Sequence, residues 1–310
     1  MGKLFKFKCR QKIFKIGNVK LGGQPGELPT VLVGNVFYKG MPEVTSHVKG
    51  EFDQKSVLKW ITMAGELSEK TGVPHFLDVM ATYPEAMRQY IAFISEQSES
   101  AFLIDGANTE TRVAGLELVT ELGLLERTIF NAISPQTPEK ELETIRDSGI
   151  TAAVLLANNE VDFSPGGRIS ILNGFNGRVG LLKTAKKAGV KKILVDTIVF
   201  DVPSIAYATE AIKLVKNELG YPAGCSPANA TYDWREVQNE YLKQGFVAYN
   251  ASAHTIAQFG GANFLIYGPI KQAKNLIPAS AMNDAIIAYH AMRRLGVKPL
   301  VENHPLYKIF

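Results

Sequence analysis

Eight short apolar runs, separated by segments with helical periodicity, constrain the fold of this chain more than any other feature. Several runs are continuously apolar, which is typical of parallel strands buried on both faces. The regular alternation of strand and helix predicts a parallel α/β fold. The predicted strands are Val31–Phe37, Phe76–Met80, Ala101–Ile104, Thr128–Asn131, Ala152–Leu156, Lys192–Val195, Ala223–Ser226 and Asn263–Tyr267.

The helical segments between these runs have recognisable ends. Most are followed by a glycine, the residue that most easily adopts the left-handed conformation at a helix C-terminus. Eight such units favour a closed (β/α)8 TIM barrel in which residues 1–310 form one domain. The predicted helices are Asp53–Lys70, Pro84–Gln97, Glu110–Leu122, a helix that opens at Thr137 and Pro138 and ends at Gly149, Arg178–Ala188, Pro203–Leu219, Asp233–Lys243 and Ser280–Leu295.

Three further segments lie outside this alternation. Residues 1–23 are predicted to contain a hairpin that turns at Gly17 and Asn18 and caps the bottom of the barrel. The segments Phe163–Gly177 and Phe246–Gly261 are predicted to be long connections at strand C-termini, where barrel enzymes carry lids and binding surfaces. Insertions without a role are the alternative for both.

The composition is that of an ordinary globular protein, with 46% apolar and 21% charged residues. The apolar runs fall well short of the roughly 20 residues that span a bilayer, and Met1–Arg10 lacks an apolar signal core. Cys9 and Cys225 lie far apart, which fits a reducing compartment. We therefore expect a cytoplasmic protein without membrane insertion. The net charge of +4 is spread along the chain and predicts no nucleic-acid surface.

Several catalytic motifs are absent from the sequence. There is no GxxxxGK[ST] phosphate-binding loop, no GxSxG nucleophile elbow and no HExxH zinc motif. The five histidines are isolated, and the two cysteines belong to no CxxC pair or Cys/His cluster. We therefore expect no metal site in this chain.

Short acids, amides and one serine recur where the predicted strands end. A single residue of this kind usually caps the next helix or binds a loop amide. Seven consecutive strand ends of this character instead predict a ring of hydrogen-bonding groups at the barrel mouth, where TIM-barrel enzymes bind their substrates. The residues are Asn35, Asp78, Asp105, Asn131, Asn158, Asn159, Asp196, Ser226 and Asn229.

Such a ring suits a neutral ligand that is rich in hydrogen-bond donors and acceptors. A reduced pterin has these properties. Its 2-amino-pyrimidinone edge offers paired N–H donors to a carboxylate, while its ring nitrogens and carbonyl group suit the amide of an asparagine. The ring of polar residues therefore predicts a pterin-binding site.

Several segments of the sequence resemble those of one family. They are GGQPGELPTVLVGNVFY, KGEFD, FLID, NAIS, ILVDT, GCSPANATYDW and FLIYGPI, in the same order along nearly the whole chain. The sequence resembles the H subunit of tetrahydromethanopterin S-methyltransferase and its bacterial relatives, which are methyltransferases acting between tetrahydrofolate and a corrinoid protein. More widely, it is similar to the pterin-binding barrels that include dihydropteroate synthase.

The resemblance implies a TIM barrel, commonly a homodimer, that holds a pterin at the strand C-termini. Matched by position, Asp105, Asn131 and Asp196 correspond to residues that hold the pterin in this family. Asn229 corresponds to the asparagine placed near N5, the pterin nitrogen that carries the methyl group. The resemblance therefore implies that the residues holding the pterin and the asparagine near N5 come from different parts of the chain.

Three further residues are predicted to bind the pterin because of their strand-end positions. They are Asp78, Asn158 and Ser226.

One departure from the family lies beside Asp105, because related sequences tend to have a serine where this chain has Gly106. The change removes one possible hydrogen bond and leaves the carboxylate in place.

The resemblance implies transfer of a methyl group between N5 of the pterin and a corrinoid. Asn229 and Asp196 are the predicted catalytic residues. Asn229 would orient and stabilise N5, and a proton would reach N5 from solvent or through Asp196, because a tertiary amine leaves poorly without one. The chain has no DxHxxG cobalamin-binding signature, so we expect the corrinoid to arrive on a partner protein or as methylcobalamin.

The sequence leaves alternatives open for the substrate and for the reaction. Tetrahydrofolate is favoured as the pterin, because segments such as YKGMPEV and GCSPANA depart from the archaeal pattern. Tetrahydromethanopterin, used by the H subunit of the coenzyme M methyltransferase complex, is the alternative. A pterin-binding protein without turnover is another. A dihydropteroate synthase would need a basic early loop and a late lysine for pyrophosphate, and the sequence has no convincing equivalent of these.

Overall fold

In the computed structural model, which describes residues 5–237 and 240–309, eight parallel strands close into a barrel. The strands follow one another around the barrel in the order β10-β11-β12-β3-β6-β7-β8-β9, which confirms the predicted (β/α)8 fold. Their bounds are β3 (Val31–Val36), β6 (His75–Ala81), β7 (Phe102–Gly106), β8 (Thr128–Ile133), β9 (Ala152–Leu156), β10 (Lys192–Asp196), β11 (Ala223–Cys225) and β12 (Phe264–Pro269).

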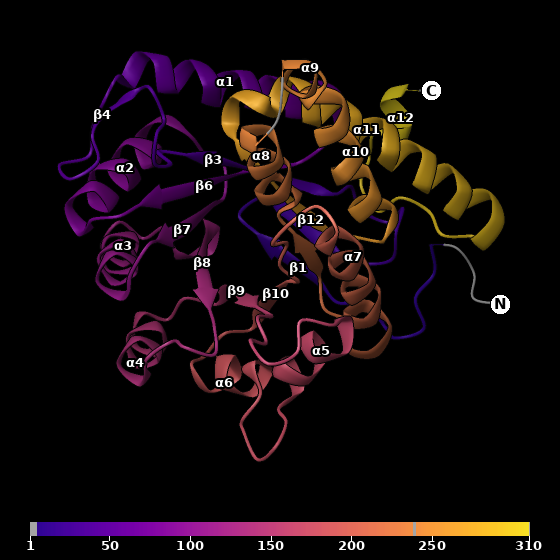
Figure 1. The fold of residues 1–310 in the computed structure, drawn as a ribbon, viewed down its shortest axis with the longest axis horizontal. Helices are drawn as coiled ribbons and strands as arrows, with labels where there is room; N and C mark the ends of the chain where they lie inside the picture. Colours follow the sequence, from indigo (N-terminus) through magenta and orange to yellow (C-terminus); the bar gives the residue numbers. More distant parts are fainter. Residues whose placement is uncertain (1–4, 238–239, 310) are drawn as a thin grey trace.

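Helices surround this barrel (Figure 1). The helix α1 (Gln54–Thr71) begins at Asp53, whose side chain accepts a hydrogen bond from Ser56 N, and ends at Gly72 in the left-handed conformation. The other helices are α2 (Pro84–Gln97), α3 (Thr109–Glu121), α4 (Glu139–Ser148), α5 (Pro165–Asn173), α6 (Leu181–Lys187), α7 (Ser204–Leu214), α8 (Pro227–Val237), α9 (Glu240–Gln244), α10 (Phe246–Phe259), α11 (Ala273–His290) and α12 (Leu306–Ile309). A short antiparallel pair, β4 (Val44–Ser46) and β5 (Glu51–Phe52), precedes α1.

The predicted long connections proved to be largely helical. The segment Phe163–Gly177 contains α5, in which Ser164 Oγ accepts a hydrogen bond from Gly167 N. The segment was predicted to be a loop because it is rich in Gly, Ser and Asn, which are poor helix formers. A Cβ on Gly167 would lie 2.1 Å from Asp162 O, so a close backbone approach explains that glycine. The segment Phe246–Gly261 forms α10.

Two helices begin earlier than predicted. The helix predicted from Asp233 begins at Pro227, which places proline in the first turn, where its missing N–H costs little. The helix predicted from Ser280 begins at Ala273 and continues through Pro278, although an interior proline normally breaks a helix. Residues 238 and 239, inside the predicted helix Asp233–Lys243, lie outside the described residues.

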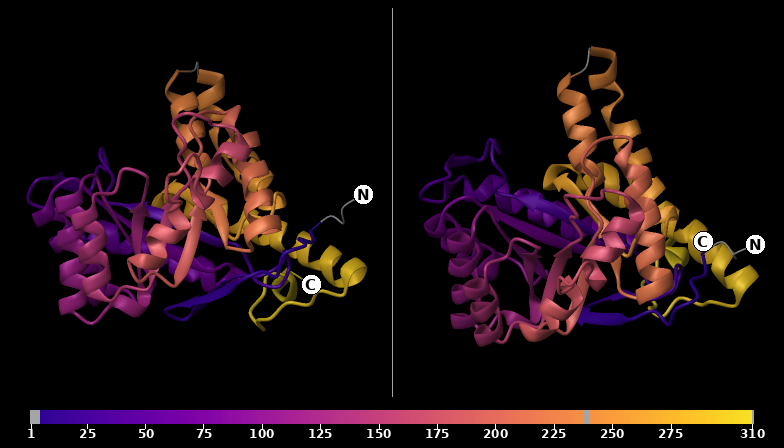
Figure 2. Two further views of the ribbon diagram at one scale, coloured as in Figure 1. Left: turned by 90° about the horizontal axis from the view of Figure 1, so that it is seen from below. Right: turned by 60° about the horizontal axis from the view of Figure 1, so that its bottom comes forward.

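A hairpin closes the bottom of the barrel, as predicted. It consists of β1 (Ile13–Ile16) and β2 (Val19–Gly22), and the chain turns at Gly17, where φ is +53°. The side chains of Ile16 and Leu21 are buried in the cluster that fills the barrel interior. Figure 2 shows this indigo hairpin on the side of the barrel opposite the orange helices α8 and α10.

The inward-facing positions of the strands change from apolar to polar along the barrel axis. The interior cluster includes Val33, Phe76, Leu103, Ile129 and Leu194. Successive side chains of a strand alternate between its two faces, so the residue two positions further on also points inward. On β3, β6, β7, β8 and β10 that residue is, in turn, Asn35, Asp78, Asp105, Asn131 and Asp196. The fold thus places the predicted polar residues together above an apolar core.

Candidate functional site

The centre of the site is a group of three side chains from neighbouring strands. Asp78 lies on β6, Asp105 on β7 and Asn131 on β8, and Asp105 is the register partner of Asn131. The carboxyl groups of Asp78 and Asp105 share a hydrogen bond, and the amide of Asn131 bonds to Asp78. Oδ1 of Asp78 is buried without a hydrogen-bond partner. The group therefore retains an unused acceptor.

The two carboxyl groups affect each other's protonation. Burial raises the pKa of Asp78 well above its ordinary range, and the negative charge of Asp105 raises it further. Burial also raises the pKa of Asp105 to about 6, while the positive charge of Arg112 and the hydrogen bond from Asp78 limit this rise. Asp78 is consequently the member of the pair that binds a proton more readily, and Asp105 is the acceptor of its hydrogen bond.

Asp196 is a third buried acid at the mouth of the barrel. It ends β10, and its Oδ1 accepts a hydrogen bond of 2.7 Å from the backbone N–H of Ile198. Ile198 has a φ of +57°, which is uncommon for a β-branched residue and turns the backbone towards the carboxylate. Burial raises the pKa of Asp196 to about 6, while this hydrogen bond and the charge of Arg168 oppose the rise.

The predicted pair Ser226 and Asn229 lies at the start of α8. Ser226 Oγ donates to Asn229 Oδ1 at 3.0 Å, with Ile266 O as a longer alternative acceptor at 3.3 Å. Ser226 is buried, whereas Asn229 is exposed at the mouth. Because Oδ1 is engaged by the serine, the Nδ2 amide of Asn229 remains available to donate to a ligand.

A cavity of about 670 Å³ lies beside this site; Asn229 lines it, whereas Asp78, Asp105 and Asp196 do not. Its wall includes Asn35, Met80, Phe200 and Asn229, and Lys39 and Lys271 also line it. Asn35 and Met80 are the register partners of Asp78 and Asp105, so the cavity lies directly beside the acid pair. Oδ1 of Asn35 is buried without a hydrogen-bond partner. The cavity thus has polar groups on its barrel side and an aromatic wall at Phe200.

The two asparagines after β9 have different surroundings. Asn159 is buried and supports its own loop: Oδ1 accepts from the backbone of Val161 and Asp162, and Nδ2 donates to Gly167 O. Asn158 has a buried Oδ1 without a hydrogen-bond partner. The structure therefore gives Asn159 a structural role and leaves Asn158 as the candidate at this strand end.

Sequence reasoning missed two arginines near the acids. Arg112 on α3 holds the buried carboxylate of Glu141 through Nε at 2.6 Å and Nη2 at 2.9 Å, and donates to Gly106 O. Arg168 on α5 is buried, and its charge acts on Asp196. The helical spacing of α3 could have placed Arg112 near the strand end. Arg168 carried no such signal because its segment was predicted to be a loop.

The part of the chain that the structure describes contains no grouped metal ligands. Among residues 5–237 and 240–309, no three or more His, Cys, Asp or Glu side chains lie together so that they could hold a metal ion. No helix in these ranges is long and apolar enough to cross a membrane.

The sequence also carries a family signature. Residues 9–300 match the profile of the tetrahydromethanopterin S-methyltransferase MtrH subunit. The chain belongs to this family. The H subunit of tetrahydromethanopterin S-methyltransferase from Methanothermobacter thermautotrophicus is 34% identical over 311 residues, which cover 99% of this chain and 100% of that protein. The corresponding protein of Methanosarcina mazei is 33% identical over 318 residues, with coverage of 99% and 100%. The resemblance in the sequence segments is thereby confirmed.

Solved structures show the same architecture for this family member. A dihydropteroate synthase of Yersinia pestis with a sulfonamide drug complex superimposes with a TM-score of 0.59 and 14% identity, covering 89% of this chain and 98% of that chain. A dihydropteroate synthase of Coxiella burnetii in complex with pteroic acid gives a TM-score of 0.55 at 12% identity, covering 88% and 99%. At these identities the likeness shows the fold alone.

Proposed function

We propose that this chain transfers a methyl group between N5 of a reduced pterin and a corrinoid that a partner protein carries or that binds as methylcobalamin. Residues 1–310 act together as one pterin-binding unit. The observation that carries this proposal is the acid pair Asp78 and Asp105 with Asn131, at the barrel mouth of a chain that belongs to a pterin methyltransferase family.

The pair fits one edge of a pterin. The carboxylate of Asp105 accepts the two N–H groups of the 2-amino-pyrimidinone edge, while Asp78 donates its one proton to Asp105 and so holds this acceptor in place. The free Oδ1 atoms of Asn35, Asp78 and Asn158 are further acceptors. Because these groups come from rigid strands, they fix the plane of the ring before reaction.

Asn229 and Asp196 are the residues that we assign to the transfer step. Nδ2 of Asn229, oriented by Ser226, donates to N5 and stabilises the lone pair that appears there when the methyl group leaves. With a pKa of about 6, Asp196 holds a proton in a fraction of molecules near neutral pH and passes it to N5. The corrinoid, when bound, supplies the cobalt that accepts or donates the methyl group.

We propose tetrahydrofolate as the pterin and tetrahydromethanopterin as the second candidate. The second is supported by the names of relatives that are 33–34% identical to this chain. The first rests on the sequence segments that depart from the archaeal pattern. The homodimer implied by the family stays a prediction, which light scattering would test.

Two substitutions separate the proposed roles. Asp105→Ala removes the carboxylate that binds the pterin edge, so calorimetry should show weaker pterin binding, by about tenfold or more. Asn229→Ala should leave binding nearly unchanged and lower the transfer rate by about a hundredfold. Asp147→Ala, at an exposed acid on α4, is the matched control. An equal loss of binding in Asp105→Ala and Asn229→Ala would contradict this division of roles.

A further inference from the structure

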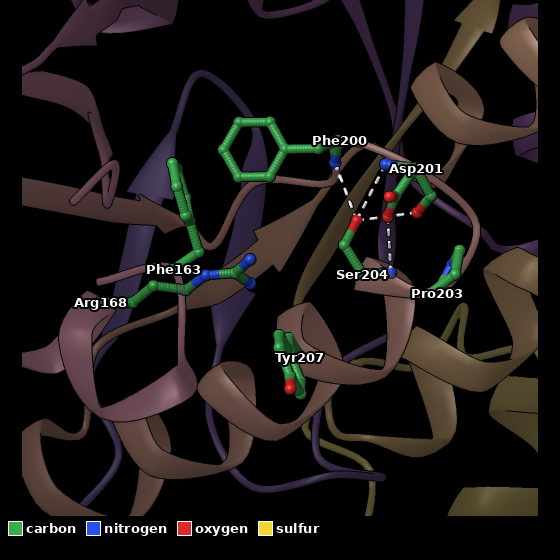
Figure 3. A pocket seen from close by; sticks show the side chains of 7 residues that line it. All are labelled: Phe163, Arg168, Phe200, Asp201, Pro203, Ser204 and Tyr207. Carbon is green, nitrogen blue, oxygen red and sulfur yellow. Dashed lines mark hydrogen bonds between the residues drawn. The ribbon is translucent and has the colours of Figure 1, made fainter. Parts of the chain in front are cut away.

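A second cavity, of about 570 Å³, lies beside the mouth between α5 and α7 (Figure 3). Three aromatic side chains line it, and the rings of Phe163 and Phe200 meet edge to face with their centres 5.3 Å apart. Phe200 lines both this cavity and the mouth cavity, so the two share one wall. We call this space the Arg168 pocket; its lining residues are Phe163, Arg168, Phe200, Asp201, Pro203, Ser204 and Tyr207.

Arg168 is the unusual member of this pocket. Its side chain is 1% exposed, yet Nη1 and Nη2 have no hydrogen-bond partner. Figure 3 shows the guanidinium pointing into the pocket, below Phe163 and Phe200 and above Tyr207. A buried charge without a hydrogen-bond partner is strongly unfavourable. The site is therefore incomplete until acceptor atoms enter it.

The acids that face Arg168 already have other partners. Asp201 Oδ1 accepts from the backbone N–H of Ser204, and Ser204 Oγ accepts from the backbone N–H groups of Phe200 and Asp201. Asp196 acts on Arg168 through its charge, but its Oδ1 is engaged by Ile198, and no ion pair within 4.0 Å joins the two side chains. The forked donor of Arg168 is thus left for a ligand.

The side chains of the Arg168 pocket indicate which kind of ligand it binds. Aromatic walls select a flat ring, and a guanidinium selects a carbonyl or carboxylate oxygen, which it can bind with two parallel hydrogen bonds. A ligand whose pterin ring fills the mouth would reach this pocket by passing Phe200. A benzoyl arm attached to the pterin has both required parts, an aryl ring and an acyl oxygen.

We propose that the Arg168 pocket is the subsite for the aryl arm of the pterin substrate, and that it selects an arm carrying an acyl or carboxylate oxygen. This inference rests on the proposed function and adds to it the subsite that recognises a folate-type arm. Folate-type pterins carry a benzoyl group in this arm. Phe163 and Phe200 contact the aryl ring, and Arg168 binds the oxygen.

Calorimetry with two ligands tests this assignment. Tetrahydrofolate carries the benzoyl arm, and 6-methyltetrahydropterin is a matched ligand without it. Arg168→Met should weaken tetrahydrofolate binding by about tenfold to a hundredfold, the range expected for hydrogen bonds to a charged group. The same substitution should change 6-methyltetrahydropterin binding by less than about twofold. Arg146→Gln, at an exposed arginine on α4, should change neither.

The two ligands distinguish failure of the aryl subsite from failure of the proposed function. If the wild-type protein binds neither ligand, the proposed function fails, and the subsite fails with it. If it binds both equally, the pterin site stands and the aryl subsite is wrong. Equal weakening of both ligands by Arg168→Met would give Arg168 a role through Asp196 alone and would also overturn the subsite.

A second variant tests the subsite independently in case Arg168→Met misfolds. Phe163 is 50% exposed, so Phe163→Ala should leave the fold intact and weaken only tetrahydrofolate binding, by about fivefold. Arg168→Met removes a buried charge without a hydrogen-bond partner, so its melting temperature should equal or exceed that of the wild type. Unchanged tetrahydrofolate binding in both variants would contradict the assignment.

Discussion

Asp78 and Asp105 form a buried pair of acids, Asp196 is a third buried acid whose charge acts on both, and burying these groups costs stability. Burial raises the pKa of each group, so the folded chain binds these protons more tightly than the unfolded chain does. For Asp105 and Asp196, the folded state holds more protons between about pH 4 and 6, so the free energy of unfolding falls as pH rises through this window. Such a cost is typical of groups kept for ligand binding.

Asp196→Asn should reveal this cost directly. The amide keeps an Oδ1 acceptor for the N–H of Ile198 but cannot ionise. We expect the variant to be more stable than the wild type at neutral pH, by about 1–3 kcal/mol, because the pKa of Asp196 is raised to about 6. Urea unfolding at several pH values would show the difference shrinking towards about pH 4. A difference that is independent of pH would contradict this explanation.

At the scale of the element, the end of β7 shows how one glycine shapes the site. A Cβ on Gly106 would lie 2.7 Å from both Cγ and the backbone N of Arg112. Arg112 in turn donates to Gly106 O and holds the buried Glu141 on α4. Gly106 therefore lets α3 begin close to Asp105, where the positive charge of Arg112 limits the rise in the pKa of that acid.

Gly106→Ser should consequently be unfavourable in this chain. We expect a loss of about 1–3 kcal/mol in the free energy of unfolding, because the start of α3 must shift to admit the side chain. Gly65→Ser is the control, because a Cβ there meets nothing within 4 Å and serine is the better helix former. Thermal unfolding would measure both variants. Equal melting temperatures for Gly106→Ser and the wild type would show that Arg112 adapts freely.

The elements also show what could be predicted from the sequence. The eight strands and the polar residues at their ends were predictable, because apolar runs and their period-two alternation decide which side chains face the barrel interior. The helix α5 was not, because its Gly167 serves a close backbone approach that only the folded chain shows. The early start of α8 was also missed, and it places Asn229 in the first turn of a helix.

The aromatic pocket lay beyond sequence reasoning altogether. Phe163 and Arg168 come from α5 and the residues before it, whereas Phe200 follows β10. Their meeting depends on how α5 packs against α7. Only the folded structure shows that Nη1 and Nη2 of Arg168 have no hydrogen-bond partner.

At the scale of the whole molecule, the barrel has a sealed end and an open end. The hairpin of β1 and β2 seals the bottom with Ile16 and Leu21, and the acids and amides occupy the other end (Figure 2). Buried Lys216 ties the sealed end together, because its Nζ donates to Gly23 O at 2.9 Å and to Asn263 Oδ1 at 2.6 Å. The sealed end supports the rigid strands on which the site depends.

Leu21→Ala tests how strongly the hairpin stabilises the barrel. Leu21 is fully buried, so the truncation should leave a cavity and cost about 2–5 kcal/mol. Ile13→Ala, on the same hairpin but 40% exposed, should cost less than about 1 kcal/mol. Denaturant unfolding would compare the two variants. A similar small cost for both would mean that the hairpin contributes little to the stability of the barrel.

The most direct test of the proposed function is methyl transfer itself. Methylcobalamin and a methylated corrinoid protein would serve as donors, with tetrahydrofolate and tetrahydromethanopterin as acceptors. We expect the wild-type protein to methylate tetrahydrofolate at N5 and Asn229→Ala to be slower by about a hundredfold. Methyl transfer to tetrahydromethanopterin alone would reassign the substrate. Absence of transfer to both pterins from both donors would contradict a catalytic role and leave a pterin-binding protein without turnover.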